Sequence, residues 1–360
     1  MKLPSLYSGL EYSSLAVILS AAFALGPSTA QADAISSFYK TKDVRLIIGT
    51  SVGGSYDVHG RTVARSIWRH IPGKPRIIVQ NKRGAGSQIT AGYVYGVAPQ
   101  DGTVMCALLN TLPMRQAIGR TRKTFDVNKF NWIGNITNDV SVLTVWNSST
   151  KARTVDDLRK MDVIIGATTA TGLSGTIPKA MNYALGTKMK IVTGYRGGLG
   201  VDQALERGEV AARAGANWSV MQSKYPHWIK ANKFTVVVQI GSHKAKGLEH
   251  VPLMHELARN KEERLILEFF STAMDVGKPI AVGPKVSKAK VKALRAAFNA
   301  MLKDPKFLAD AKKQGLVISP VKGTDLQKLI GKIVASPTHI TKAAKKIFGK
   351  RKKKKKKKKS

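Results

Sequence analysis

Cysteine is almost absent from this chain of 360 residues, in which Cys106 is the only one. It lies in the apolar run Val104–Leu109, which reads as a buried strand. A single thiol cannot form an internal disulfide, and a cysteine in a buried strand is usually unreactive. The length of the chain instead allows one large or two medium domains, each with its own hydrophobic core.

Acidic residues are also scarce, because 22 Asp and Glu stand against 60 Lys and Arg, for a formal net charge of +38. No compact pair of carboxylates stands out for acid–base catalysis. Residues 350–359 are all Lys or Arg, so we expect a disordered poly-Lys tail over residues 346–360. Such a tail could contact polyanions by charge, but no interleaved aromatic residues indicate specific nucleic-acid recognition.

The motifs of common enzyme classes are missing as well. The turn at residues 49–54 lacks the Lys-Ser/Thr pair of a Walker A loop, and residues 52–60 do not fit the G-x-G-x-x-G frame of dinucleotide-binding proteins. The seven histidines show no metal-ligand spacing, and no G-x-S-x-G nucleophile motif is present. We therefore predict a protein that is not an enzyme and that has no catalytic residues, metal or cofactor.

The first apolar run has the pattern of a targeting segment. Lys2 precedes the apolar stretch Leu15–Leu25, and Ala30-Gln-Ala32 supplies a small-x-small cleavage signal. The stretch is shorter than the roughly 20 apolar residues that span a bilayer. We therefore expect residues 1–32 to be a signal peptide cleaved after Ala32, and the mature protein to lie in a bacterial periplasm. A retained membrane anchor is the alternative.

Strand and helix patterns alternate after residue 40, which favours an α/β fold with parallel sheets. Strands are expected at 44–49, 76–80, 103–109, 140–146, 163–165, 190–193, 210–214, 234–240 and 278–282. Helices are expected at 55–70, 84–94, 177–185, 201–206, 252–270, 287–302, 305–313 and 325–334. We predict two lobes, lobe one at 40–133 plus 275–345 and lobe two at 134–274, with two crossover strands as the hinge.

Glycine-rich turns follow four of these strands, at residues 49–54, 84–87, 166–174 and 194–200. Ligands of open α/β sheets bind at the carboxyl ends of the strands, so the four turns should face one cleft. The first N–H groups of a helix lack internal partners and carry partial positive charge. The pattern therefore predicts an anion site.

Several motifs together resemble one family, the Bug solute receptors of tripartite tricarboxylate transporters. The first are Leu46-Ile-Ile-Gly-x-x-x-Gly-Gly-Ser-Tyr-Asp57 with Arg61, and Val79-Gln-Asn-Lys-Arg-Gly-Ala-Gly-Ser87. Ala98-Pro-Gln-Asp-Gly-Thr103, Tyr195-Arg-Gly-Gly198 and Ala204-Leu-Glu-Arg-Gly-Glu-Val210 follow in the family's order. The likeness runs from about residue 38 to 335.

This resemblance implies a two-lobe periplasmic binding protein of type II, or Venus-flytrap, architecture, in which each lobe has a mostly parallel sheet. It implies a receptor that captures a small organic carboxylate between the lobes and delivers it to inner-membrane transporter subunits. The ligand residues that it implies are Ser51, Val52, Gly53, Gly54, Ser55, Thr169, Thr171, Ser174, Tyr195, Arg196, Gly197 and Gly198.

Asp57 has two compatible interpretations, because a carboxylate in the first turn of a helix can pair with the helix dipole or hold the turn in shape for a ligand. We include it among the predicted ligand-binding residues. Ala211 and Ala212 stand where the family commonly has an aspartate, so the ligand and the effect of this change stay open. The alternative function is a cationic protein that binds cell-envelope polyanions through its basic tail.

Overall fold

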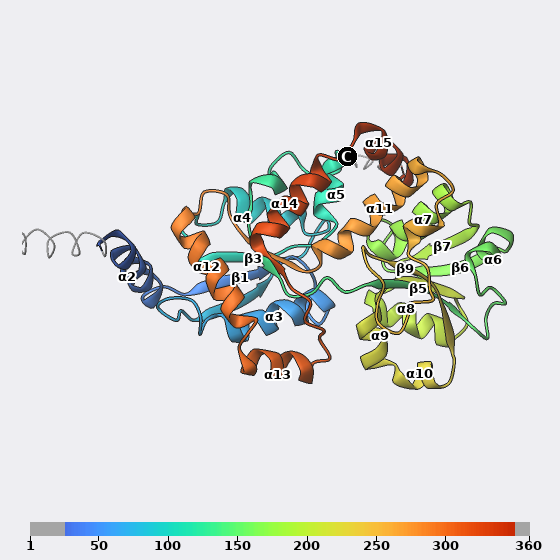
Figure 1. Ribbon diagram of the computed structural model, residues 1–360, viewed down its shortest axis with the longest axis horizontal. Helices are drawn as coiled ribbons and strands as arrows, with labels where there is room; N and C mark the ends of the chain where they lie inside the picture. The colour runs from blue at the N-terminus through green and yellow to red at the C-terminus, as the bar shows by residue number, and fades with distance from the viewer. Residues whose placement is uncertain (1–25, 350–360) are drawn as a thin grey trace, which may run out of the picture.

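The computed structural model describes residues 26–349, with side chains from residue 32 onward. The chain forms two α/β lobes that lie side by side along the long axis of the molecule (Figure 1). Each lobe is built around one sheet, with six strands in the first and five in the second. The predicted two-lobe α/β fold is confirmed, and both sheets are mixed rather than mostly parallel.

The first sheet has the strand order β11-β4-β10-β3-β1-β2. Its strands are β1 (Val44–Ile48), β2 (Ile77–Asn81), β3 (Val104–Ala107), β4 (Asn131–Asn135), β10 (Pro279–Val282) and β11 (Val321–Lys322). The helices α3 (Ser55–Ile67) and α4 (Gln88–Gly96) connect β1, β2 and β3, which therefore pair in parallel. β10 returns to this sheet as predicted, antiparallel to β3 and β4.

The second sheet has the strand order β7-β6-β8-β5-β9. Its strands are β5 (Ser141–Trp146), β6 (Val163–Ala167), β7 (Met189–Thr193), β8 (Ala212–Asn217) and β9 (Phe234–Ile240). β6 pairs in parallel with β7 and β8, because α7 (Leu173–Leu185) and α8 (Gly197–Glu206) carry the chain back between them. β5 enters from lobe one and runs antiparallel to β8 and β9.

The remaining helices cover the two sheets. With lobe one lie α2 (Gly26–Lys40), α5 (Leu112–Ala117), η2 (Val127–Lys129), α12 (Lys288–Met301), α13 (Pro305–Lys313) and α14 (Gly323–Val334). With lobe two lie α6 (Val155–Lys160), α9 (Trp218–Lys224), α10 (Pro226–Lys230), η3 (Met254–Leu257), α11 (Lys261–Val276) and α15 (Thr338–Ile347). No helix in the described part is long and apolar enough to cross a membrane.

The ends of two helices show how local side chains set the boundaries. The predicted capping box before α6 is present, since Thr154 and Asp157 satisfy each other's backbone N–H groups. The helix expected at 252–270 instead begins at Lys261, because the Asn260 side chain accepts a hydrogen bond from the backbone N–H of Glu263. It continues to Val276, six residues beyond the expected end.

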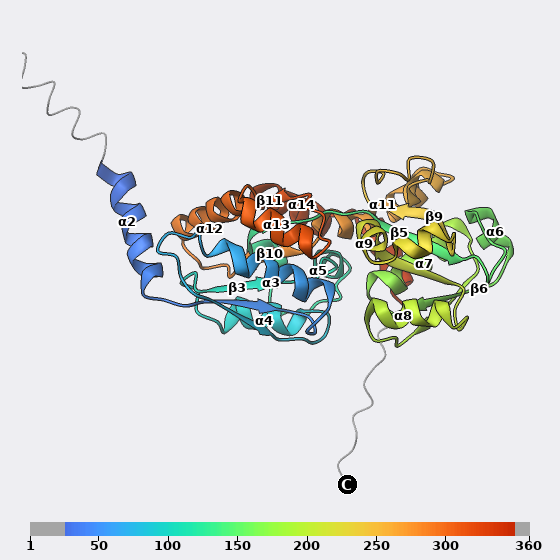
Figure 2. The ribbon, with the colours of Figure 1, turned by 90° about the horizontal axis from the view of Figure 1, so that it is seen from below.

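The predicted signal peptide and tail lie partly outside the described residues, which leave out 1–25 and 350–360. Helix α2 contains Ala32, after which cleavage is predicted, and projects from the end of lobe one that is remote from lobe two (Figure 2). The cleavage position stays a prediction.

Alternate residues of the first sheet serve different hydrophobic clusters, as the two faces of a strand require. Leu46 and Ile48 pack with Met105 in one cluster, and Ile47 and Cys106 belong to the other. Burial raises the pKa of the Cys106 thiol, so the thiolate is disfavoured. The expectation of a buried, unreactive cysteine agrees with this position.

Two segments cross between the sheets, residues 136–140 from β4 to β5 and residues 277–278 from α11 to β10. The Asn135 side-chain oxygen joins them by accepting the backbone N–H groups of Thr137, at 2.6 Å, and Lys278, at 3.3 Å. Gly277 packs closely on Thr137 with a φ of +63°. These crossings are the two segments that we predicted to be the hinge, and their role as a hinge stays a prediction.

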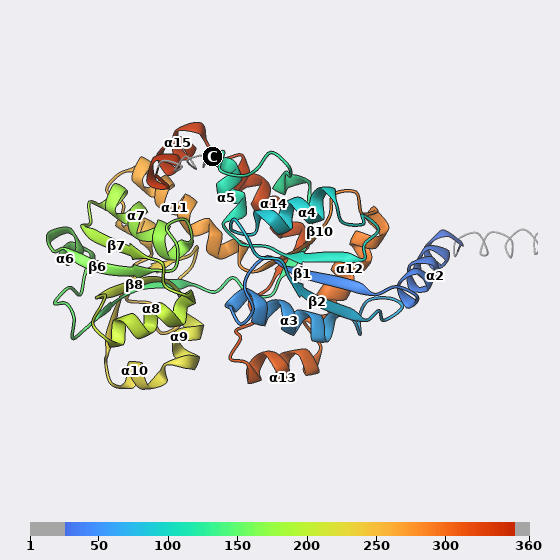
Figure 3. The ribbon, with the colours of Figure 1, turned by 180° about the vertical axis from the view of Figure 1, so that it is seen from behind.

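A third connection links the lobes near the C-terminus. Helix α14 packs on β4 and α5 of lobe one, whereas α15 packs on α7 and α11 of lobe two (Figure 3). Ile340, Ala344 and Ile347 supply the buried face of α15. From the sequence we expected residues up to 345 to belong to lobe one, whereas α15 packs on helices of lobe two. The other lobe boundaries stay predictions.

The crossing at Gly277 yields a stability prediction. Gly277→Ala should lower the free energy of unfolding by about 2–4 kcal/mol, because a Cβ at this positive φ would also clash with the Thr137 carbonyl oxygen. Gly186→Ala is the matched control, since Gly186 has a φ of +71° with no atom near the added Cβ, and should cost about 1 kcal/mol. Urea unfolding measures both, and equal losses would contradict the close packing of the crossover.

Candidate ligand site

The candidate site in lobe one is the turn between β1 and α3. β1 ends at Ile48 and α3 begins at Ser55, so the chain reverses over residues 49–54. Gly53 has a φ of +76°, a conformation that residues with a Cβ rarely adopt. This glycine lets the turn close on the start of the helix.

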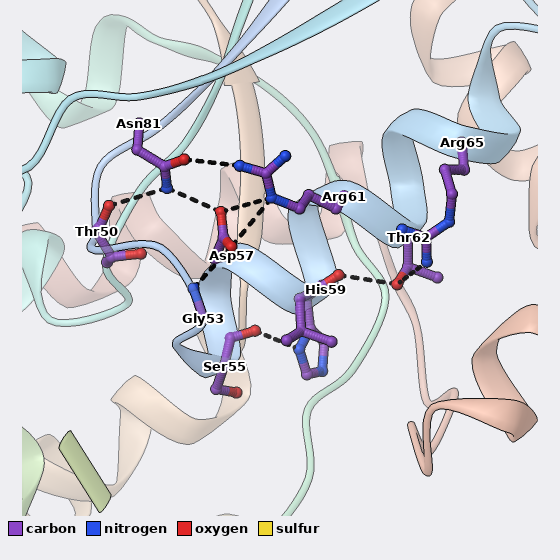
Figure 4. Close-up of polar contacts among 10 residues, drawn as sticks. Thr50, Gly53, Ser55, Asp57, His59, Arg61, Thr62, Arg65 and Asn81 are labelled. Atoms are coloured by element: carbon purple, nitrogen blue, oxygen red, sulfur yellow. Dashed lines mark hydrogen bonds and ion pairs between the residues drawn. The ribbon is translucent and has the colours of Figure 1, made fainter.

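A buried network centred on Asp57 fixes the shape of this turn (Figure 4). The carboxylate accepts the backbone N–H of Gly53 at 2.9 Å, the Arg61 Nε–H at 3.0 Å and the Asn81 amide at 2.8 Å. Asn81 also donates to the Thr50 carbonyl at 3.1 Å and accepts from the Arg61 guanidinium at 2.9 Å. Of the two interpretations of Asp57, these contacts match the shaping role.

The charge state of Asp57 follows from the same contacts. Burial acts to raise the pKa of its carboxyl group, but the hydrogen bonds from Gly53, Arg61 and Asn81 outweigh it and leave the pKa below the usual range. Asp57 is therefore ionised at neutral pH, and its charge is neutralised locally by Arg61.

The next amides of the turn are free to bind a ligand. Among the described residues, no acceptor lies within hydrogen-bond distance of the backbone N–H groups of Gly54, Ser55 and Tyr56, and no side chain caps α3. The Gly53 amide is already taken by Asp57. The hydroxyl of Thr50, which the sequence did not single out, is buried without a partner at the same turn.

The other predicted residues of this turn lie at its surface. Ser51, Val52 and Ser55 are exposed, and Val52 has an exposed fraction of 71%. The structure thus brings the predicted lobe-one residues together on one turn.

Lobe two offers a similar turn before α7. The Thr169 hydroxyl accepts the backbone N–H of Gly172 at 2.9 Å, and the Ser174 hydroxyl accepts that of Thr168 at 3.1 Å. Thr171 is exposed between them. The backbone N–H groups of Leu173 and Ser174 have no acceptor among the described residues, because α7 has no side-chain cap. The predicted threonine and serine hydroxyls therefore shape this turn, and its amides remain free.

A third uncapped helix start belongs to α8. Arg196 precedes it without a capping hydrogen bond, and the backbone N–H groups of Gly197 and Gly198 find no acceptor in the described part of the chain. Tyr195 lies partly buried beside this turn, where burial and the charge of Glu209 raise the pKa of its phenol. Arg196 is exposed.

A buried ion pair beneath this turn was not anticipated from the sequence. The Arg213 guanidinium pairs with Asp202, and the Tyr225 hydroxyl donates a hydrogen bond to the same carboxylate. The guanidinium lies against Gly198 at the start of α8. Burial lowers the pKa of Arg213 to about 10, so it stays charged at neutral pH. The sequence signal for this ion pair was Arg213 itself, a charged residue inside the predicted strand 210–214.

The start of α3 is also tied to the crossover between the lobes. The Tyr56 hydroxyl donates to the Gly277 carbonyl at 3.2 Å and accepts the backbone N–H of Asn110 at 3.1 Å. Asn110 in turn donates to the Ala273 carbonyl at 2.6 Å, near the end of α11. The lobe-one turn is therefore hydrogen-bonded directly to the crossover at Gly277.

The two sets of predicted ligand residues lie on different lobes, and no hydrogen bond joins them among the described residues. Two surface hollows, of about 420 and 630 Å³, lie elsewhere, on lobe one along α3, β2, α12 and α13. Neither is lined by a predicted ligand residue. The candidate site rests on the amides at the helix starts that make no hydrogen bond within the described residues.

Residues 26–349 contain no group of three His, Cys, Asp or Glu side chains placed to hold a metal ion. The chemistry that the described turns offer is therefore that of hydrogen-bond donors: backbone N–H groups at helix starts, with few charged side chains. Donors of this kind suit an anion, because the N–H groups at the start of a helix carry partial positive charge.

The two-lobe fold is shared with solved solute-binding proteins. A TctC solute-binding protein from Polaromonas, solved without ligand, has a TM-score of 0.63 at 18% identity over 86% of this chain and 99% of its own. The periplasmic binding protein BugD gives 0.60 at 18% identity, covering 85% and 98%. MatC from Rhodopseudomonas palustris with bound malate gives 0.61 at 16% identity, covering 84% and 99%. These likenesses show the fold and confirm the resemblance predicted from the sequence.

At the level of sequence the similarity is shorter. No protein-family model matches the chain. The UPF0065 protein in the gbd 5' region of Cupriavidus necator is 33% identical over 120 residues, which are 33% of this chain and 35% of that protein. The matched segment thus spans about a third of the curated relative.

The Asp57 network yields a pH-dependent prediction. Asp57→Asn should lower the free energy of unfolding at pH 7 by about 1–3 kcal/mol, because it removes charge-assisted hydrogen bonds to a buried group. The folded pKa of Asp57 is below its unfolded value, so this stability is present above the unfolded pKa and is lost as pH falls through the folded one. Denaturant titrations should therefore show the gap between wild type and variant shrinking toward about pH 3.

Asp156→Asn is the matched control for that experiment. Asp156 is exposed and forms a surface ion pair with Arg159, so its replacement should cost no more than about 0.5 kcal/mol. A loss at Asp57 that equals this control, or that does not change with pH, would refute the shaping role.

Proposed function

We propose that this chain is a non-catalytic solute receptor of the Bug type. It captures a small organic carboxylate between its lobes in the periplasm and delivers it to inner-membrane subunits of a tripartite transporter. The observation that carries the proposal is the set of uncapped helix starts: α3 in lobe one, and α7 and α8 in lobe two. The malate in the structure of MatC, which has the same fold, supports a carboxylate as the ligand class.

Free backbone amides suit this task for a physical reason. A carboxylate oxygen accepts several N–H groups at once, and the aligned peptide dipoles of a helix add partial positive charge at its start. Such amides are held rigidly by the turn, so binding orders few side chains. The Asp57 network provides that rigidity in lobe one, because it fixes the turn without using the amides of Gly54 and Ser55.

Capture requires the two sets of amides to reach one ligand, which the crossovers at 136–140 and 277–278 allow. A ligand that contacts both lobes stabilises the closed arrangement relative to the open one by its extra contacts. The transporter would recognise that closed form. Helix α15, which belongs to the third connection, packs on lobe two and would move with that lobe.

A second candidate function is polyanion binding by a cationic surface. The observation that favours it is the 630 Å³ hollow on lobe one, where four cationic side chains surround apolar ones. The cationic residues are Arg61, Arg65, Lys74 and Arg76. Binding of this kind would weaken steeply with salt.

The lobe-one amides can be tested with one pair of variants. Gly54 has a φ of −78°, which proline adopts readily, so Gly54→Pro removes the N–H and keeps the φ of this residue. Gly54→Ala keeps the N–H, and its Cβ would lie 3.5 Å from the Ser51 carbonyl oxygen, an ordinary contact. We expect a carboxylate at 100 times its Kd to stabilise the wild-type chain by about 2.7 kcal/mol in a thermal-shift screen of mono-, di- and aromatic carboxylates.

That stabilisation should disappear in Gly54→Pro and persist in Gly54→Ala. Equal responses of the two variants would remove the α3 amides from the site. If no carboxylate stabilises the chain and a sulfated polysaccharide does, in a salt-dependent way, the cationic surface becomes the function.

A further inference from the structure

A buried lysine lies at the crossover between the lobes and is unused by the site described so far. Lys278 is the residue between Gly277 and β10, and only 8% of it is exposed. Its backbone N–H donates to Asn135 in the other crossover. This hydrogen bond fixes the backbone of Lys278 at the crossover between the lobes.

The ammonium group of Lys278 makes no hydrogen bond and no ion pair with the described residues. Its contact is a cation–π interaction with Tyr56, whose ring centroid lies 5.8 Å from Nζ. Because Tyr56 is the second residue of α3, the ammonium lies near the first turn of that helix. A largely buried cation without an ion-pair partner is costly.

The titratable groups near Lys278 are His59 and Asp139. Burial, and then the charge of Lys278, hold the pKa of His59 in α3 well below its usual range, so His59 is neutral at pH 7. Asp139 in the other crossover attracts Lys278 only from beyond ion-pair distance, and its carboxylate accepts the Ser219 hydroxyl. Burial lowers the pKa of Lys278 to about 8, with Asp139 acting in the opposite direction.

We propose that Lys278 is the fixed counter-charge for a carboxylate of the ligand, held beside the free amides of Gly54 and Ser55. This inference rests on the proposed function and assigns the specificity-determining residue of its lobe-one half. The uncapped start of α3 and the ammonium beside Tyr56, which lacks an ion-pair partner, are separate observations that favour the same anion. Binding would complete the missing ion pair at the hinge, so ligand charge and lobe closure would be coupled at one residue.

The test uses isothermal titration calorimetry on the full chain with malate and succinate, and with succinamate, in which one carboxylate of succinate is an amide. Lys278→Met should weaken succinate binding about 10- to 100-fold, the usual effect of losing a charge-assisted contact, and bring it close to succinamate. Lys278→Arg should retain most of the affinity. Lys285→Met, an exposed lysine of the same lobe, is the control for net charge.

Two further readouts separate this role from a structural one. Wild-type affinity should fall as pH rises from 7 to 9, because the free ammonium loses its proton near pH 8, and Lys278→Arg should show no such fall. The unfolding midpoint of ligand-free Lys278→Met should stay level or rise, since an unpartnered buried charge is removed. A lowered midpoint with unchanged succinate affinity would make Lys278 a structural partner of Asp139 and overturn the proposal.

The outcomes also distinguish this inference from the proposed function. If Lys278→Met binds succinate as tightly as wild type while Gly54→Pro does not bind it, the receptor stands and the role of Lys278 is refuted. If the wild-type chain binds none of these carboxylates, both are refuted. If Lys278→Met does not fold, an affinity that is constant from pH 7 to 9 in the wild type would by itself overturn the proposal.

Discussion

The candidate site depends first on the carboxylate of Asp57, which closes the turn between β1 and α3. It accepts hydrogen bonds from the Gly53 backbone N–H, Arg61 and Asn81, and the Arg61 guanidinium neutralises its charge within the turn. Without that internal neutralisation, a carboxylate at this point would repel an anionic ligand. With it, the amides that follow stay free and the positive end of α3 is open to an anion.

The base of the hinge links this turn to the movement of the lobes. Tyr56 bonds to the Gly277 carbonyl, and Asn135 bonds to both crossovers, so the lobe-one turn and the moving segments share one set of contacts. Lys278 adds an unpaired positive charge at the same place. A ligand bound there contacts the elements that set the angle between the lobes, which is a physical basis for coupling capture to closure.

Sequence patterns predicted the elements whose signals are local. β9 and α13 were predicted with the bounds that the structure shows, from an apolar run and from a proline at the first helical position. β4 was missed because it contains only two apolar side chains, Trp132 and Ile133. The turns of the candidate site could be predicted, because glycines mark them in the sequence. The contacts between them and the rest of the chain could not, because Tyr56 and Gly277 are 221 positions apart and no pattern in one sequence indicates such a contact.

The central claim is that backbone amides of both lobes bind the ligand. Hydrogen–deuterium exchange measured by mass spectrometry, on the full chain with and without saturating carboxylate, tests it most directly. The account predicts slower exchange in the peptides that cover residues 50–58 and 194–200, because amides that donate to a bound ligand are protected. A carboxylate that binds while exchange at both turns stays unchanged would contradict it.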